Sequence, residues 1–153
     1  MIVVIQRVRE AAVSVDGAEV ARIDRGMLVL AGIERGDDVA NVAAMAEKVA
    51  TLRIFEDPEG RMNLGLPEVA GSVLAVSQFT LAGDIRKGRR PSFDDALPGP
   101  EARPLFDAFV ARLRQLGVPT RTGVFGAMMQ VALVNDGPVT LVHRREPATG
   151  QAR

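Results

Sequence analysis

Two stretches of this chain are strongly apolar, and they constrain its fold more than any other feature. The first, GMLVLAGI, covers residues 26–33, and the second, SVLAVSQFTL, covers residues 72–81. A strand exposed on one face alternates apolar and polar residues, so an unbroken apolar run indicates a strand covered on both faces. We therefore expect residues 26–33 to form a central strand and residues 72–81 to form another strongly apolar strand.

The segments around these strands carry hairpin, helix and turn patterns. β-Branched residues flank Asp16-Gly17, which favours a β-hairpin near the start of the chain. Apolar side chains recur at helical spacing in two places, which predicts two helices. The expected elements are a hairpin over residues 1–23, helices at 38–51 and 101–116, a strand at 52–57 ending in the turn 57–60, loops at 62–71 and 82–100, and two last strands on either side of residues 135–138.

Each predicted helix has terminal signals of its own. Asp37 or Asp38 is the candidate N-cap of the first helix, and Gly117 is suited to end the second. Pro104 is tolerated only if it lies in the first turn of the second helix. The expected inner face of that helix consists of Leu105, Phe106, Phe109, Val110, Leu113 and Leu116.

Strands outnumber helices, and hairpins mix with longer crossovers. This combination predicts one α+β domain over residues 1–147, in which two main helices pack on a curved, barrel-like sheet of mixed and antiparallel strands. A length of 153 residues fits a single domain. We expect residues 148–153 to form a disordered C-terminal tail.

Composition excludes several classes of chemistry. The chain has no cysteine, tryptophan or tyrosine and one histidine, so thiol nucleophiles and His-rich metal sites are ruled out. Its formal net charge is zero, so contact with nucleic acid must rely on local basic clusters. No apolar run is long enough to span a membrane, and the start lacks a secretory pattern, so we expect a cytoplasmic protein.

The segment SQFT, residues 77–80, ends the second apolar strand with polar side chains. Alternation along the strand would direct Ser77 and Phe79 to one face, and Gln78 and Thr80 to the other. One interpretation is a strand leaving the core, with its hydroxyl groups bonded to loop backbone. The other is a strand end whose free backbone N–H groups point into a pocket and stabilise an oxyanion.

A basic loop follows, with Arg86, Lys87, Arg89 and Arg90 around Gly88. Such a run is either a solvated loop or a phosphate site, in which glycine allows close backbone approach and arginine binds bidentately. The carboxylates nearby, Asp84, Asp94 and Asp95, lack the spacing of a metal site, so we expect no metal and no cofactor.

Near the C-terminus, Gly137-Pro138 interrupts an apolar run in VALVNDGPVTLV, residues 131–142. By spacing alone this is a plain turn, since glycine and proline commonly separate strands. The lone His143 lies three residues after Thr140, on the opposite face of a strand, and is interpreted as a solvent-facing edge residue.

Three segments together resemble the D-aminoacyl-tRNA deacylase family. They are VSQFTL (76–81), GDIRKGRRPSF (83–93) and FGAMMQVALVNDGPVTL (125–141). The segments MIVVIQRV (1–8) and LRIFEDPEGRMNL (52–64) match as well, so the resemblance covers residues 1–141.

The resemblance implies a homodimer that hydrolyses the ester between a D-amino acid, or mischarged glycine, and the 3′ end of tRNA. A cis Gly137-Pro138 peptide would enter the partner's site and reject L-amino acids by collision. Arg7, Asn135 and Thr140 would hold that gate. The N–H groups of Phe79 and Thr80 would stabilise the oxyanion, Ser77 and Gln78 would orient the substrate, and the tRNA 2′-hydroxyl would assist water. Arg86, Lys87, Arg89 and Arg90 would contact phosphates.

Two alternatives stay open at this point. A related deacylase could act on an L-amino acid with Gly137-Pro138 in the trans form. Arg7 disfavours this alternative, because the resemblance implies a different residue at that position in the L-acting relatives. A non-catalytic RNA-binding module could use the basic loop alone, although the intact SQFT segment speaks against that.

Overall fold

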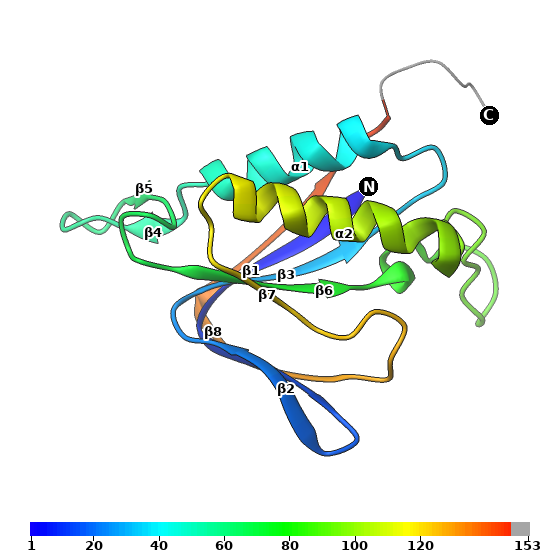
Figure 1. The fold of residues 1–153 in the computed structure, drawn as a ribbon, viewed down its shortest axis with the longest axis horizontal. Coiled ribbons are helices and arrows are strands. Elements are labelled where there is room, and N and C mark those ends of the chain that lie inside the picture. The colour runs from blue at the N-terminus through cyan, green and yellow to red at the C-terminus, as the bar shows by residue number, and fades with distance from the viewer. Residues whose placement is uncertain (148–153) are drawn as a thin grey trace.

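The computed structural model describes residues 1–147, which form a six-stranded mixed sheet, two long helices and a small two-stranded sheet (Figure 1). The order of the large sheet is β2-β1-β3-β6-β7, and β8 pairs with β1. The elements are β1 Ile2–Val15, β2 Ala18–Ile23, β3 Gly26–Gly32, α1 Val39–Thr51, β4 Phe55–Glu56, β5 Met62–Leu64, β6 Ser72–Ser77, the 3-10 turn η1 Phe79–Ala82, α2 Gly99–Gln115, β7 Thr120–Thr122 and β8 Gln130–Arg144.

Strand β1 organises the sheet because it pairs with three other strands. Its first half is antiparallel to β3, its second half is antiparallel to β2, and β8 follows its other edge along nearly the whole length. Strands β3, β6 and β7 are parallel to one another. The result is a strongly curved, barrel-like sheet with α1 and α2 side by side on one face, as the fold class predicted (Figure 1).

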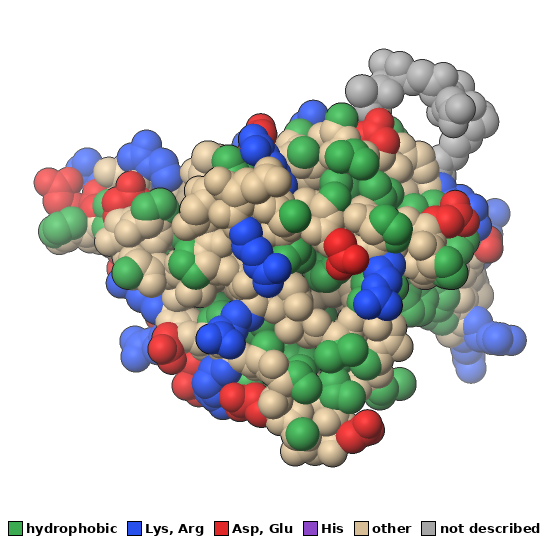
Figure 2. Space-filling view, in the orientation of Figure 1, with side chains coloured by type: hydrophobic (Ala, Val, Ile, Leu, Met, Phe, Trp, Pro, Cys, Tyr) green, Lys and Arg blue, Asp and Glu red, His purple; other side chains and the backbone are tan. Residues whose placement is uncertain are grey.

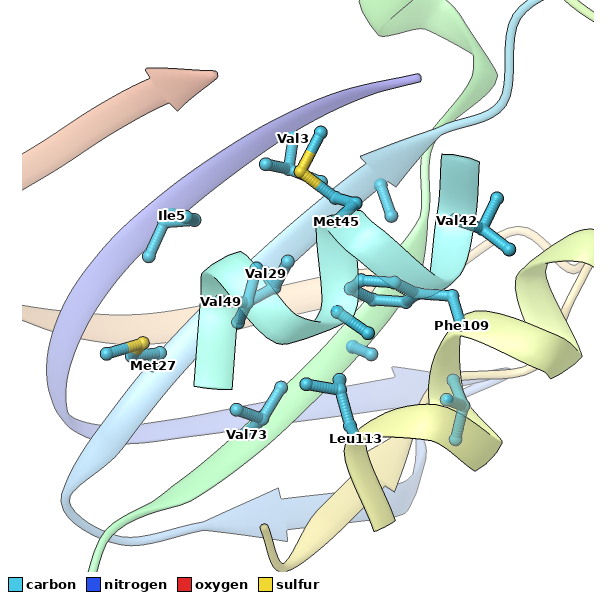
Figure 3. Close-up of a cluster of buried hydrophobic side chains, with 14 of the residues drawn as sticks. Val3, Ile5, Met27, Val29, Val42, Met45, Val49, Val73, Phe109 and Leu113 are labelled. Atoms are coloured by element: carbon cyan, nitrogen blue, oxygen red, sulfur yellow. The ribbon is translucent and has the colours of Figure 1, made fainter. Parts of the chain in front are cut away.

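The two apolar segments form adjacent strands that are buried on both faces, as predicted for residues 26–33. In β3, Met27 and Val29 point into the core beneath the helices, while Leu28 points into a second core under the other face. The helix-side core is filled by Met45 from α1 and Phe109 from α2, both with no exposed surface (Figure 3). Complete burial of so large a ring stabilises the fold by about 3–5 kcal/mol relative to alanine.

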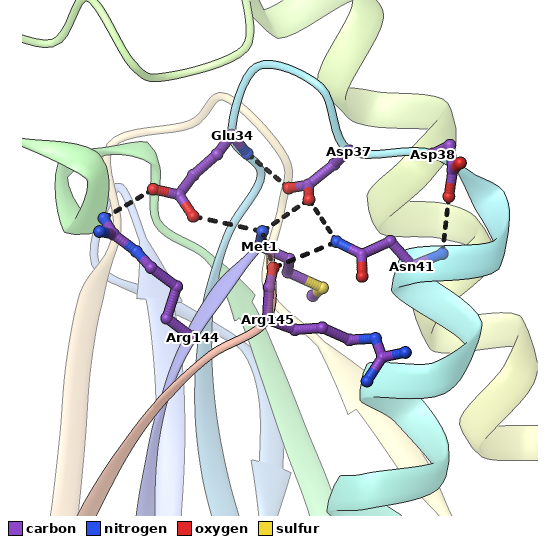
Figure 4. A network of polar contacts seen from close by, with 7 residues as sticks. All are labelled: Met1, Glu34, Asp37, Asp38, Asn41, Arg144 and Arg145. Atoms are coloured by element: carbon purple, nitrogen blue, oxygen red, sulfur yellow. Dashed lines mark hydrogen bonds and ion pairs between the residues drawn. The ribbon is translucent and has the colours of Figure 1, made fainter. Parts of the chain in front are cut away.

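A polar network closes the end of the molecule where the chain begins (Figure 4). The Met1 ammonium donates to Asp37 Oδ1 at 2.6 Å and to the Arg145 carbonyl at 3.0 Å. Asp37 also accepts from Asn41 Nδ2, and Glu34 pairs with Arg144 at 2.7 Å. These contacts tie β1, α1 and the end of β8 together, while Asp38 alone caps α1 through the Asn41 N–H.

Both predicted helices are confirmed, but α2 differs in detail. It begins at Gly99 rather than 101, so Pro104 lies inside the helix and not in its first turn as expected. Leu116 was assigned to the inner face, but it is the C-cap residue and is 39% exposed. The helix ends before it can turn Leu116 toward the sheet, and Gly117 takes a positive φ of 82° there.

Other boundaries differ from those expected because pairing with a neighbouring strand, rather than the local residue pattern, sets where a strand begins and ends. The strand expected at 52–57 is reduced to Phe55–Glu56, and the expected loop 62–71 contains β5, which pairs with that strand. Strand β7 was not predicted. Strand β6 ends at Ser77 rather than 81, where its parallel pairing with Ala31 ends. The tail expected at 148–153 lies outside the described residues.

Candidate active site

The Gly-Pro interruption is a bulge inside one strand, not a turn between two strands as the sequence suggested. Strand β8 runs unbroken from Gln130 to Arg144 beside β1. Gln6 pairs with Thr140, but Val8 pairs with Asn135, so residues Asp136–Val139, the Gly-Pro bulge, lie opposite Arg7 alone. The Gly137-Pro138 peptide is cis, and both residues are exposed.

Arg7 holds the bulge from inside the fold. Its side chain is buried, its Nε donates to the Asp136 carbonyl at 2.8 Å, and its Nη1 donates to the Ile54 carbonyl at 2.7 Å. Its Nη2 also lies 3.8 Å from Glu56 Oε1. Because an arginine side chain stays charged in proteins, burial requires such partners. The guanidinium therefore ties the bulge to β4 and the residue before it.

Position 137 requires glycine both for its backbone conformation and for lack of space. Its φ is +138°, and a Cβ atom there would lie 2.9 Å from Val139 Cγ2 and 3.0 Å from Arg7 Nη2. The conformation is one that L-residues rarely adopt. Glycine at this position keeps the bulge in contact with Arg7.

The Asn135 side chain spans the bulge from its other side. Its Oδ1 accepts from the Val139 N–H, and its Nδ2 donates to Thr140 Oγ1, both at 2.9 Å. Gln6 Nε2 donates to the same hydroxyl at 3.3 Å. Asn135 and Thr140 thus lie where sequence reasoning expected a brace. Gln6 was missed, and only the pairing of Gln6 with Thr140 reveals it.

The SQFT segment leaves the sheet as a tight turn, so the expected alternation of its side chains is wrong. The Gln78 N–H still donates to the Ala31 carbonyl, but η1 begins at the next residue. Phe79 is 58% exposed and packs edge-on against Phe93, with ring centroids 5.2 Å apart. Gln78 Nε2 donates to Thr80 Oγ1, which gives that hydroxyl an amide partner rather than a base.

The start of η1 presents two backbone donors. The turn is closed by Leu81 N–H to Gln78 O and by Gly83 N–H to Thr80 O. Within residues 1–147, the N–H groups of Phe79 and Thr80 have no backbone acceptor, as is usual at the start of a helical turn. Two adjacent donors beside an exposed surface can bind a developing oxyanion.

The basic loop is closed at its base by reciprocal hydrogen bonds between Asp84 and Ser92, at 2.8 and 3.0 Å. Arg86 folds back on Asp84, with Nε–Oδ1 at 2.9 Å and Nη2–Oδ2 at 2.7 Å. Hydrogen bonds from the Arg86 side chain and backbone lower the pKa of Asp84 to about 2. The charge of Arg86 is therefore matched locally, while Lys87, Arg89 and Arg90 extend from the exposed loop.

Acidic side chains accompany the basic ones over part of the surface. On the face shown in Figure 2, lysine and arginine side chains are interspersed with acidic ones. No group of three metal-ligating side chains occurs within the described residues 1–147, and no helix there could cross a membrane. His143 is half-buried on β8 opposite Val3.

One chain does not bring the bulge and η1 together. Ser77 pairs with Ala31, Ala31 with Val3, and Val3 with His143, so β6 is three strand spacings, about 14 Å, from β8. The bulge lies opposite Arg7, which is about 13 Å further along β1 than Val3. The two halves of the candidate site are thus separated by roughly 20 Å within the sheet.

Comparison with known proteins finds relatives along nearly the whole chain. The family model described as D-Tyr-tRNA(Tyr) deacylase matches residues 4–144. Proteins named D-aminoacyl-tRNA deacylase from Geobacter sulfurreducens and Thermomicrobium roseum are 60% and 61% identical, covering 91% and 92% of both chains.

Solved structures share the fold as well. A protein described as c-Myc DNA Unwinding Element Binding Protein is 37% identical, with a TM-score of 0.89 over 95% of this chain and 99% of that one. A probable eukaryotic D-amino acid tRNA deacylase has a TM-score of 0.79 at 20% identity, over 93% and 97% of the two chains, and shows likeness of fold alone.

The contacts of Asn135 predict how the bulge responds to substitution. Asn135→Ala leaves the Val139 N–H without its acceptor, so this amide should exchange with solvent at least about tenfold faster, the equivalent of 1.4 kcal/mol. Asn135→Asp keeps the acceptor and should leave Val139 protected. Hydrogen exchange measured by NMR compares the two variants, and equal protection of Val139 in wild type and Asn135→Ala would refute this assignment.

Proposed function

The chain belongs to the D-aminoacyl-tRNA deacylase family, and on this premise we propose that it hydrolyses the ester joining a D-amino acid to the 3′-terminal adenosine of tRNA. The match over residues 4–144 to that family, with relatives at about 60% identity, carries the proposal. The products are the free amino acid and tRNA. Glycine mischarged on tRNA is a further substrate, and the cytoplasm is the site of action.

Chirality is checked by the Gly-Pro bulge, which a second copy of the chain inserts beside η1. The exposure of Gly137 and Pro138 supports this, as does their separation from η1 within one chain. The bulge carbonyls face the α-carbon of the bound amino acid. A D side chain or a hydrogen points away from them, whereas an L side chain collides. Because Arg7 and Asn135 fix the bulge, it cannot yield without losing hydrogen bonds.

A homodimer is supported by the free edge of β8. Among the described strands, β8 pairs only with β1, which leaves its other edge open along much of its length. Val134, Leu141 and Val142 expose apolar surface on this strand. Open, apolar strand edges favour association with another chain. Such a dimer brings a second bulge within reach of the first chain.

The chemistry is addition of water to the ester carbonyl, followed by departure of the ribose 3′-oxygen. The N–H groups of Phe79 and Thr80 stabilise the negative charge that develops on the carbonyl oxygen. The 2′-hydroxyl of the same ribose accepts the proton from water and passes one to the leaving 3′-oxygen, so protons balance. Ser77 and Gln78 orient the ester. The Gln78 amide also orients Thr80 by donating a hydrogen bond to the Thr80 hydroxyl.

The basic loop contacts acceptor-stem phosphates. Lys87, Arg89 and Arg90 are available in the exposed loop, whereas Arg86 first has to leave Asp84 or share it. Phosphate contacts release counterions, so binding weakens as the salt concentration rises. This loop affects affinity for tRNA more than it affects the hydrolytic step.

The direct test uses tRNA charged with D-tyrosine, glycine or L-tyrosine. We expect release of D-tyrosine and glycine well above the rate without protein, and hydrolysis of the L-ester at least about 100-fold more slowly, since collision costs at least about 2.7 kcal/mol. The measurement is the fraction of charged tRNA remaining with time. Comparable loss of both enantiomers, or no loss of any ester, would refute the proposal.

Thr80→Ala separates backbone catalysis from a threonine nucleophile. We expect kcat within about tenfold of wild type, because the Thr80 N–H is retained when the hydroxyl is removed. Single-turnover hydrolysis of D-tyrosyl-tRNA measures this, with circular dichroism as a check on the fold. Loss of activity by more than about 10⁴-fold in a folded variant would instead indicate that the hydroxyl attacks the ester.

A further inference from the structure

Gly32, the last residue of β3, lies directly against the turn that follows β6. A Cβ atom at this position would lie 2.9 Å from the Gln78 carbonyl oxygen, 3.1 Å from Ile2 Cγ2 and 3.2 Å from Leu81 Cβ. The φ of Gly32 is not in the left-handed region, unlike that of Gly137. Glycine is therefore needed at position 32 for space rather than for its backbone conformation.

The atom that Gly32 approaches belongs to the peptide group that carries a proposed oxyanion donor. The carbonyl of Gln78 and the N–H of Phe79 are opposite ends of one planar unit, so the direction of one fixes the direction of the other. The oxygen end is held by the Leu81 N–H at 3.3 Å. The residue is also held on its N-terminal side, where the Gln78 N–H donates to Ala31 O at 2.8 Å.

We propose that Gly32 is a positioning residue that sets the direction of the Phe79 N–H through the Gln78 carbonyl. This inference rests on the proposed deacylase function, in which that N–H binds the oxyanion. With no side chain at position 32, the Gln78 carbonyl packs against the end of β3, and the Phe79 N–H points away from it. A methyl group at this position pushes the carbonyl and so tilts the donor.

The expected effect falls on the transition state rather than on binding. A contact of 2.9 Å to a carbonyl oxygen is shorter than real Cβ atoms tolerate, so the peptide has to shift by several tenths of an ångström. Misplacement on this scale, and the loss of one oxyanion donor, each lower the rate by about 10–100-fold or more. An interaction made only in the transition state changes kcat while leaving KM unaltered.

The experiment measures kcat and KM of Gly32→Ala on D-tyrosyl-tRNA. We expect kcat to fall about 10–100-fold with KM within about twofold of wild type. Gly71→Ala is the matched control, because its Cβ would also meet an atom at 2.9 Å, but that atom is the Leu66 Cδ2 methyl group, and Gly71 precedes β6 whereas η1 follows it. This control should lose stability and retain kcat.

A second pair of variants separates the carbonyl contact from the side-chain contact. Ile2→Ala removes the Cγ2 atom that a Gly32→Ala methyl would meet, and so helps the double variant to fold, but it leaves the Gln78 carbonyl in the way. We expect the double variant Ile2→Ala/Gly32→Ala to keep the low kcat and Ile2→Ala alone to be near wild type. Recovery of kcat in the double variant would overturn the inference.

Failure of this inference is distinguishable from failure of the proposed function. If the wild-type protein leaves D-tyrosyl-tRNA intact, the deacylase proposal itself is wrong. If wild type is active and folded Gly32→Ala has the same kcat, the deacylase proposal stands and the role of Gly32 is refuted. An equal loss of kcat in Gly71→Ala would also refute it, because a general loss of packing would then explain both.

Discussion

Arg7 carries a permanent positive charge into the interior of the sheet, where its side chain is only 6% exposed. A buried charge is costly unless hydrogen bonds replace its water. Two backbone carbonyls do so here, one from Asp136 in β8 and one from Ile54 just before β4. Because those carbonyls belong to segments distant in sequence, this one side chain determines how β1, the Gly-Pro bulge and the small sheet fit together.

The other half of the site depends on backbone geometry in a different way. At the end of β6, the chain separates from β3, passes close to Gly32, where there is no side chain, and makes a single tight turn. The turn presents N–H donors and an amide-bonded hydroxyl but no charged side chain. In the proposed function these fixed dipoles stabilise the oxyanion, so a chain with one histidine and no cysteine can hydrolyse an ester.

Sequence alone predicted the elements whose signals are local. The unbroken apolar run at 26–33 forms β3, which is buried on both faces. The helical spacing of apolar residues over 38–51 corresponds to α1, which Asp38 caps. Features set by partners were not predictable in this way. The continuity of β8 depends on its pairing with β1, the early end of β6 depends on Ala31 and Gly32, and the role of Gln6 depends on register with Thr140. The resemblance to a known family identified SQFT and Gly137-Pro138, yet only the sheet register shows that they are far apart in one chain.

The central claim is that the Gly-Pro bulge of one chain completes the site at η1 of another, and mixed dimers test it most directly. Phe79→Pro removes one proposed donor. The methyl group of Gly137→Ala meets Val139 Cγ2 and Arg7 Nη2 and pushes the bulge from its place beside the bound amino acid into the partner's site, where it obstructs the ester. Each homodimer should therefore be nearly inactive on D-tyrosyl-tRNA. In a dimer purified with one chain of each kind, one site combines both defects and the other combines two intact halves. We predict that these mixed dimers recover about half of the wild-type D-tyrosyl-tRNA deacylation rate, as two-fold symmetry requires. Mixed dimers no more active than the two parent variants would contradict the account.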